Sequence, residues 1–336
     1  MAIDAYASMA HYARHLLPIW HALAPEVRGT FWAADRDGTW GVPITAQHPG
    51  PSQLMMVASH LDAMQMAPRP LVYVEHGAGQ TYDGDPSDER AATSPSYAGG
   101  ADHERVVLFL CPSERVAAAW SARYPASQVA TVGSPVLDRW TGPDRQSLAP
   151  RATWEAPVVA VTFHWECVLC PETTSAWRYY DSALPALARE ESFTLLGHGH
   201  PRLWPTIARR WESLGVASTP DPDRVMAEAD VLVADNTSLL YEFAATGRPV
   251  VVLNAPWYRR TVHHGLRFWD AVPGEMVDGP DDLAGAIHRA LSSPGWYATE
   301  RSRAVAVAYD DLMDGCAAQR SATAITEVLH ARSSRG

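Results

Sequence analysis

Residues 231–246 read VLVADNTSLLYEFAAT, and this stretch decides the fold class of the second half of the chain. Its four opening apolar residues are enough for one buried strand. The polar turn Asp235–Ser238 contains two good helix N-cap residues, Thr237 and Ser238. The residues after the turn have helical spacing. A buried strand that passes through a short turn into a helix is the repeating unit of parallel α/β sheets.

The same alternation extends on both sides of this stretch. Further strands are expected at 158–163, 193–196 and 249–253, and helices at 174–190, 204–214, 223–229 and 238–246. Three more helices are expected at 281–291, 299–313 and 317–332. There is no internal repeat at the roughly 20–50-residue periods of solenoids. The second half is therefore predicted to form a doubly wound, mostly parallel sheet.

The first half shows a similar alternation. A helix is expected at 5–23, kinked or split at Pro18, and another at 113–123. Strands are expected at 54–58, 71–74, 106–110 and 129–132. The stretch from Thr141 to Pro157 is rich in Pro, Arg, Ser and Gly, and we interpret it as a linker. The fold prediction is α/β, with two Rossmann-like doubly wound domains at 1–145 and 155–336 facing a cleft, and with the last helices able to pack back on the first domain.

Composition narrows the function classes. The chain has 336 residues, of which 47% are hydrophobic and 19% charged, as in a globular protein of two domains. The net charge of −11 argues against a broad nucleic-acid surface and a polybasic membrane anchor. No apolar run reaches the roughly 18 residues of a membrane span, and no signal-peptide pattern is present. We expect a cytoplasmic protein with reduced thiols and leave a homo-oligomer open.

Metal binding is not predicted. The four cysteines include one lone Cys167-x-x-Cys170 pair, without a second pair at zinc-site spacing, so buried thiols are the simpler interpretation. The acidic loop Asp83–Pro86 is interpreted as solvated. His198 and His200 lack a third ligand at a clear spacing.

A histidine and two glycines follow the strand expected at 71–74, as His76-Gly77-Ala78-Gly79. Glycines allow a tight turn and a close approach to the backbone. The imidazole would lie at the carboxyl end of a strand, where a neutral ring can accept a proton from a hydroxyl near neutral pH. His76 is the candidate general base, and the alternative is a turn histidine that bonds a nearby carbonyl.

Residues 196–202 read LGHGHPR and again lie between a strand and a helix. His198, His200 and Arg202 converge at this turn, which suits an anionic group; the alternative is a solvent-exposed loop. In the turn Asp235–Ser238, hydroxyls at a helix start would suit phosphate. Glu242, one turn further, could accept hydrogen bonds from ribose hydroxyls.

Together these motifs resemble GT-B-fold transferases, and most closely the CDP-glycerol glycerophosphotransferase family. His76-Gly77 looks like the family's His-Gly, and His200-Pro201 like its His-Pro pair. Asp235, Thr237 and Ser238 resemble its Asp-x-Ser-Ser turn. The other matching segments are Gly133–Asp138, Thr162–Trp165, Gly247–Pro249, Pro273-Gly274, and Asp314-Gly315 with Ala317 and Arg320. The departures are His198 in place of a basic residue, Asn236 in place of an aromatic one, and the residues after Gly77.

The resemblance implies transfer of a glycosyl or polyol-phosphate group from a nucleotide-diphosphate donor to an acceptor hydroxyl, with no cofactor or metal required. His76 would be the base. The donor would be bound by Gly77, Thr162, His198, His200, Arg202, Asn236, Thr237, Ser238 and Glu242. Two alternatives stay open, a sugar-nucleotide 2-epimerase and a non-catalytic nucleotide-binding module. The donor base and the acceptor are not indicated.

Overall fold

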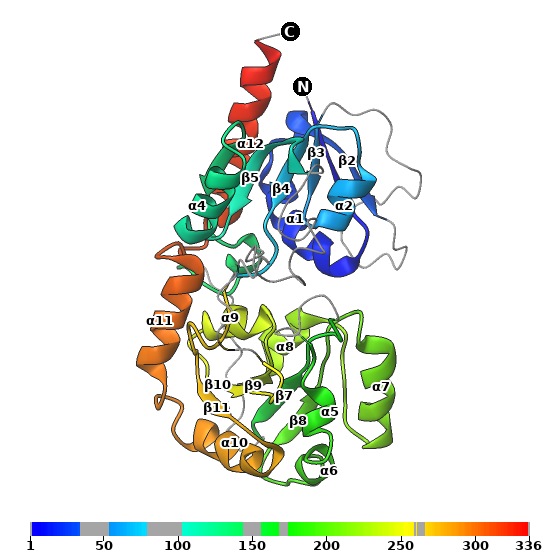
Figure 1. Cartoon of the computed structure of the whole chain (residues 1–336), viewed down its shortest axis with the longest axis vertical. Helices are drawn as coiled ribbons and strands as arrows, with labels where there is room; N and C mark the ends of the chain where they lie inside the picture. The colour runs from blue at the N-terminus through cyan, green and yellow to red at the C-terminus, as the bar shows by residue number, and fades with distance from the viewer. Residues whose placement is uncertain are drawn as a thin grey trace. The chain divides into compact units, whose positions relative to one another are not determined.

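The computed structural model describes residues 2–33, 54–78, 103–143, 156–167, 174–258, 260 and 266–334. They form two compact units. The first unit contains the described residues up to 143 and the C-terminal segment from Ala308, and the second contains those from 156 to Val307 (Figure 1). The acidic loop Asp83–Pro86, Gly79, Cys170 and most of the expected linker lie outside the described residues.

The first unit is built on a parallel sheet with the strand order β2-β1-β3-β4-β5-β6. The strands are β1 (Ile3–Ala7), β2 (Arg28–Ala33), β3 (Met55–Val57), β4 (Leu71–Val74), β5 (Val106–Cys111) and β6 (Gln128–Thr131). The last four confirm the strands predicted from apolar runs. β2 was not predicted, because its sequence, RGTFWA, has two small or polar residues for each aromatic one.

Helices cover both faces of this sheet. They are α1 (Ala10–Ala22), α2 (His60–Gln65), α4 (Glu114–Arg123) and α12 (Ala317–Ser333), with short 3-10 turns at Pro25–Val27 and Pro135–Leu137. Leu16 of α1 and Ile325 of α12 share one core with the strands, whereas Trp120 of α4 belongs to a second core on the other face. The C-terminal helix therefore completes the core of the first unit.

The helix predicted at 5–23 is wrong in its first residues, which form strand β1. Ala5 and Tyr6 are compatible with either structure, so local preference decides little. Tertiary pairing decides instead, because β1 lies between β2 and β3 and pairs with both. α1 then runs to Ala22 without a break at Pro18. Burial of Ile19 and Trp20 holds the turn that follows the proline.

The second unit contains a parallel sheet with the order β11-β10-β9-β7-β8. Its strands are β7 (Val158–Thr162), β8 (Thr194–Gly197), β9 (Val231–Ala234), β10 (Val250–Leu253) and β11 (Glu275–Val277). The first four were predicted; three-residue β11 is too short to show a pattern. All four residues of β9 and of β10 are buried, as expected for strands covered on both faces.

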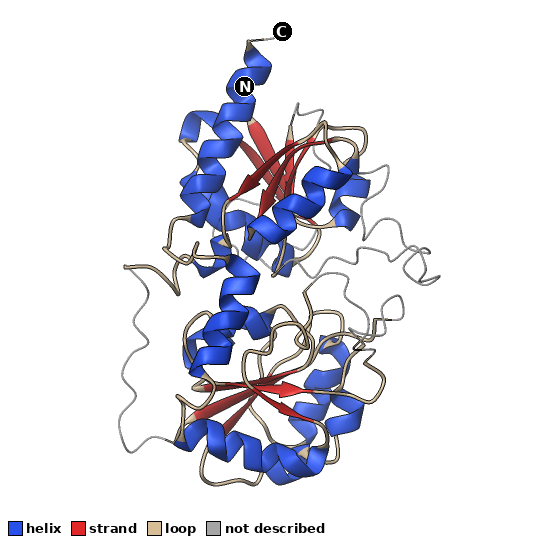
Figure 2. Ribbon diagram, turned by 60° about the vertical axis from the view of Figure 1, so that its left-hand side comes forward, coloured by secondary structure: helices blue, strands red, loops and turns tan. Residues whose placement is uncertain are grey.

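The helices of the second unit are α5 (Trp177–Tyr180), α6 (Leu184–Leu187), α7 (Trp204–Ser213), α8 (Pro222–Glu228), α9 (Leu239–Ala244) and α10 (Leu283–Ser292), with a 3-10 turn at Pro280–Asp282. α11 (Ala298–Tyr309) leads back to the first unit. Figure 2 shows helices on both sides of the strands in each unit. The single helix predicted at 174–190 is wrong: the segment forms two short helices, because Pro185, the second residue of α6, cannot donate to a carbonyl of the preceding turn.

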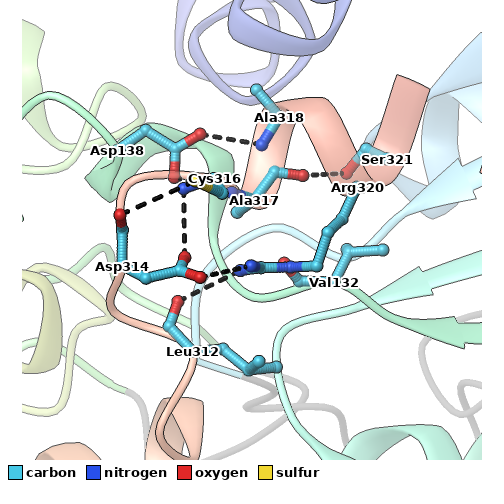
Figure 3. Close-up of polar contacts among 9 residues, drawn as sticks. All are labelled: Val132, Asp138, Leu312, Asp314, Cys316, Ala317, Ala318, Arg320 and Ser321. Atoms are coloured by element: carbon cyan, nitrogen blue, oxygen red, sulfur yellow. Dashed lines mark hydrogen bonds and ion pairs between the residues drawn. The ribbon is translucent and has the colours of Figure 1, made fainter. Parts of the chain in front are cut away.

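The Gly133–Asp138 motif and the Asp314–Arg320 segment form one junction inside the first unit (Figure 3). Both oxygens of Asp138 accept backbone N–H groups at the start of α12, from Ala317 at 2.9 Å and Ala318 at 2.7 Å. Arg320 donates to the Val132 carbonyl at 2.8 Å and to Asp314 at 2.7 Å. The junction therefore connects the segment that follows β6 to the start of the C-terminal helix α12.

A glycine is required in this junction. Gly142 has a φ of +79°, and a Cβ there would lie 2.5 Å from the Asp314 carbonyl oxygen. Both the backbone conformation and the close approach of the two chain segments exclude a side chain. These motifs thus have a structural explanation that does not involve a ligand.

Replacing Asp138 with alanine is expected to destabilise the first unit by about 1–2 kcal/mol, because the α12 N-terminus loses its capping carboxylate. Urea denaturation followed by circular dichroism measures the change. Asp311→Ala, at an exposed position just before the junction, is the control and should leave the midpoint unchanged. Equal midpoints for the two variants would contradict the capping role.

Candidate functional site

The carboxyl ends of β7 and β8 bring Thr162 and His198 together. Thr162 Oγ1 lies 2.6 Å from His198 Nδ1, and the two residues are only 2% and 5% exposed. The His198 backbone N–H donates to the Val161 carbonyl at 2.8 Å. The predicted pair is therefore adjacent but enclosed, so its effect on a ligand would come mainly from fixing the shape of the turn.

The glycines on either side of His198 are required by close packing against α7. A Cβ on Gly197 would lie 2.5 Å from the Trp211 ring, and one on Gly199 would lie 2.7 Å from Ile207 Cγ2. Trp211 and Ile207 are fully buried residues of α7. The Gly-His-Gly-His sequence thus lets α7 pack closely against the strand end while His200 remains partly exposed.

His200 lies in an aromatic and basic cluster. Its ring centroid is 5.0 Å from that of His164 and 6.2 Å from that of Trp165. The Arg202 guanidinium lies 4.6 Å from the Trp165 ring centroid, in a cation–π contact. Within the described part of the chain no ion pair joins Arg202 to a carboxylate. The cluster combines two imidazoles and one guanidinium, which are donors suited to an anion.

The orientation of His200 follows from one local bond. Its Nδ1 accepts the backbone N–H of Arg202 at 3.1 Å. This bond requires Nδ1 to be unprotonated, so the proton of the neutral ring is on Nε2. His200 is thereby set up as a hydrogen-bond donor through Nε2.

The turn after β9 contributes two hydroxyls and a buried carboxylate. Thr237 and Ser238 are both partly exposed, and the Ser238 side chain does not cap α9. Asp235 is fully buried, and its carboxylate accepts N–H groups from His164 at 2.7 Å and Ala176 at 2.9 Å. Burial raises the pKa of this carboxyl to about 7, against the lowering effect of its hydrogen bonds.

Two other predicted residues are enclosed. Asn236 is 1% exposed and Glu242 is 3% exposed. Glu242 lies in the first turn of α9, four residues after Ser238.

In the first unit, His76 follows β4 and is partly exposed. Gly77 has a φ of +85°, which explains the glycine of the His-Gly pair. The His76 ring lies 5.2 Å from that of Tyr12 and 6.0 Å from that of His15, both on α1. Burial, followed by the nearby Arg14, His76 and His11 side chains, holds the pKa of His15 well below its ordinary value. His15 is therefore neutral beside His76.

His164, Trp165 and the α1 residues were not among the predicted site residues. His164 carried a usable signal, since it immediately follows the strand predicted at 158–163. Tyr12 and His15 carried none, because α1 reaches the β4 end only in the folded unit.

Cys111 and Cys167 are buried, and Cys316 is exposed. Among the described residues, no group of three potential metal ligands comes together. No helix in the described ranges has the length and apolarity that crossing a membrane demands.

Part of the chain matches a known family model. Residues 178–327 match the family model described as CDP-Glycerol:Poly(glycerophosphate) glycerophosphotransferase. No curated protein matches the chain. Among solved structures, the wall teichoic acid polymerase TagF is similar, with a TM-score of 0.72, 13% identity, and coverage of 98% of this chain and 89% of that chain.

The chain therefore has the fold of TagF, and residues 178–327 resemble the glycerophosphotransferase family. Two other structures share the GT-B architecture. Staphylococcus aureus MnaA, solved with UDP, has a TM-score of 0.65 and 13% identity, covering 98% of this chain and 97% of that chain. The Neisseria meningitidis UDP-GlcNAc 2-epimerase bound to UDP-GlcNAc has a TM-score of 0.58 and 13% identity, covering 98% of this chain and 99% of that chain. At this identity these structures establish the fold, two Rossmann-like domains.

Proposed function

We propose that this protein transfers a glycosyl or polyol-phosphate group from a nucleotide-diphosphate donor to an acceptor hydroxyl. The observation that carries the proposal is the cluster of the hydrogen-bond donors His164, His200 and Arg202 at the carboxyl ends of β7 and β8. His200 and Arg202 lie within residues 178–327, which match the glycerophosphotransferase family model. Ligands of open parallel sheets bind at this edge. A TagF variant was soaked with CDPG, which makes a CDP-linked donor the first to test.

The second unit would bind the donor. His200 donates through Nε2 to a diphosphate oxygen, Arg202 supplies positive charge, and the Thr237 and Ser238 hydroxyls donate from the neighbouring strand end. Glu242 accepts hydrogen bonds from the ribose. Thr162, His198 and Asn236 fix the shape of the strand ends around the nucleotide, and Gly77 shapes the turn that carries His76. Such donors contribute most when negative charge develops on the departing nucleotide.

His76 would act on the acceptor. Its ring takes the hydroxyl proton as the oxygen attacks the phosphorus of a polyol phosphate or the anomeric carbon of a sugar. The bond from that atom to the nucleotide's phosphate oxygen breaks, and the electron pair leaves with the nucleotide. Direct displacement on a sugar inverts the anomeric carbon. These steps need no metal or cofactor, because side chains neutralise the diphosphate.

A thermal-shift screen against CDP-, UDP-, GDP-, ADP- and dTDP-linked donors tests the function. A ligand at one hundred times its Kd stabilises the folded state by about 2.7 kcal/mol, so the preferred donor should raise the melting temperature clearly. Product analysis then separates the alternatives, because a 2-epimerase converts its sugar nucleotide without an acceptor. A protein that no donor stabilises would contradict the proposal.

Replacing Thr237 and Ser238 together with alanine is expected to weaken nucleotide binding roughly 10- to 100-fold. Each hydrogen bond to a charged group contributes about 1.5–3 kcal/mol, and water compensates part of the loss. Calorimetry with the preferred nucleotide measures the change. Ser213→Ala is the matched control, because that exposed hydroxyl donates to the Arg210 carbonyl within α7. Unchanged affinity in the double variant would remove both hydroxyls from the site.

A further inference from the structure

One peptide unit in the second unit is held at both ends. The Phe163 carbonyl accepts the His200 backbone N–H at 2.8 Å, and the His164 N–H donates to Asp235 Oδ1 at 2.7 Å. Because a peptide group is planar and rigid, these two bonds fix its orientation. The exits of three strands, β7, β8 and β9, are therefore joined through this single group.

The same carboxylate closes the segment that begins at His164. Its second oxygen accepts the Ala176 N–H at 2.9 Å, and the Ser175 N–H donates to the Trp165 carbonyl at 3.2 Å. The Ser175 hydroxyl also bonds to Asp235. Both ends of the stretch 164–176 thus converge on one buried side chain.

We propose that Asp235 is a positioning residue for the donor site, which holds His164 beside His200 so that both imidazoles bind one diphosphate. This inference rests on the proposed function and adds two roles to it. His164 becomes a second binding imidazole, 5.0 Å from the first. Asp235, which is fully buried, acts on the ligand only through His164.

The chemistry of the site explains why a carboxylate occupies this position. Two backbone N–H groups and the Ser175 hydroxyl point at the Asp235 side chain. Asp235 must therefore present hydrogen-bond acceptors in more than one direction. Asparagine has nearly the same shape, but its amide NH₂ would face one of those N–H donors. A buried donor left without an acceptor is costly, so the His164 or Ala176 backbone should shift in an Asp235→Asn variant.

A double-mutant cycle on the full-length protein tests the inference, with CDP as the probe and UDP run in parallel. Asp235→Asn and His164→Ala are each expected to weaken binding about tenfold or more, consistent with the loss of a bond to a charged group. If Asp235 acts through His164, the combined variant should bind about as well as His164→Ala alone. Asp235→Asn combined with Ser238→Ala should instead show additive losses.

Asp230 provides a matched control at the other edge of the same strands. Its carboxylate accepts the Val158 N–H at 2.7 Å, joining the starts of β9 and β7 as Asp235 joins their ends. Asp230→Asn should leave CDP affinity unchanged. Circular dichroism confirms folding, and Asp235→Ser replaces Asp235→Asn if the latter does not fold. In the unliganded protein, the His164 amide NMR signal should move in the Asp235 variant and not in the Asp230 variant.

The outcomes separate this inference from the proposed function. If the wild type binds nucleotide and the Thr237/Ser238 variant binds weakly, but Asp235→Asn binds normally, the positioning role is overturned and the function stands. Additive losses for Asp235→Asn and His164→Ala would also overturn it. If the wild-type protein binds no nucleotide, both the positioning role and the proposed function are contradicted.

Discussion

Replacing His76 with alanine is expected to lower turnover by roughly 10²–10⁴-fold, the usual contribution of a general base. The imidazole lies two residues after the end of β4, on a turn that Gly77 makes possible at a φ of +85°. Nucleotide affinity should be unchanged, because the residues proposed to bind the donor belong to the second unit. Turnover is measured as nucleotide release from the donor that the thermal-shift screen selects, with an acceptor present.

The control for this variant is His21→Ala, at an exposed position near the end of α1. It should keep full turnover, and calorimetry should find the same nucleotide affinity in wild type, His76→Ala and His21→Ala. Near-full turnover in His76→Ala would remove the base assignment. A loss of nucleotide affinity that matches the loss of turnover would assign His76 to binding instead.

The second large effect concerns pH and Asp235. An aspartate in the unfolded chain loses its proton near pH 4, whereas burial raises the pKa of the folded Asp235 carboxyl to about 7. Between these values the folded protein keeps a proton that the unfolded chain releases. Stability from this group is therefore fully present below about pH 4 and is lost as the pH rises to about 7.

The difference in unfolding free energy between wild type and Asp235→Asn should consequently change by about 3 kcal/mol between pH 5 and pH 8, in the direction that disfavours the wild type at high pH. Urea denaturation at several pH values measures it. Histidine titrations affect both proteins alike and cancel in the difference. A difference that does not vary with pH would show that the carboxyl titrates normally.

A buried acid with a raised pKa costs stability at neutral pH, and such costs are concentrated at functional sites. The pairing of strands in the sheet does not depend on the Asp235 side chain, because β9 pairs with β7 and β10 through its backbone. The proposed positioning of His164 accounts for a carboxylate at this position despite its cost in stability.

Local sequence was sufficient for much of the architecture. β4 and β9 coincide with their predicted bounds, because a four-residue apolar run between polar turns has little alternative to a buried strand. The same pattern located His76 and His200 near strand ends. In a parallel sheet all carboxyl ends lie at one edge, so the sequence alone determined that edge as the place for polar side chains.

Tertiary structure decided the partners. Asp235 meets residues 71 and 59 positions away, and Asp138 meets a backbone N–H 179 positions away. It also decided that 3–7 form a strand and that His198 is enclosed while His200 is partly exposed. The reason is physical: periodicity encodes which side chains are buried, but hydrogen-bond partners depend on the order of strands in a sheet, which no local pattern of the chain carries.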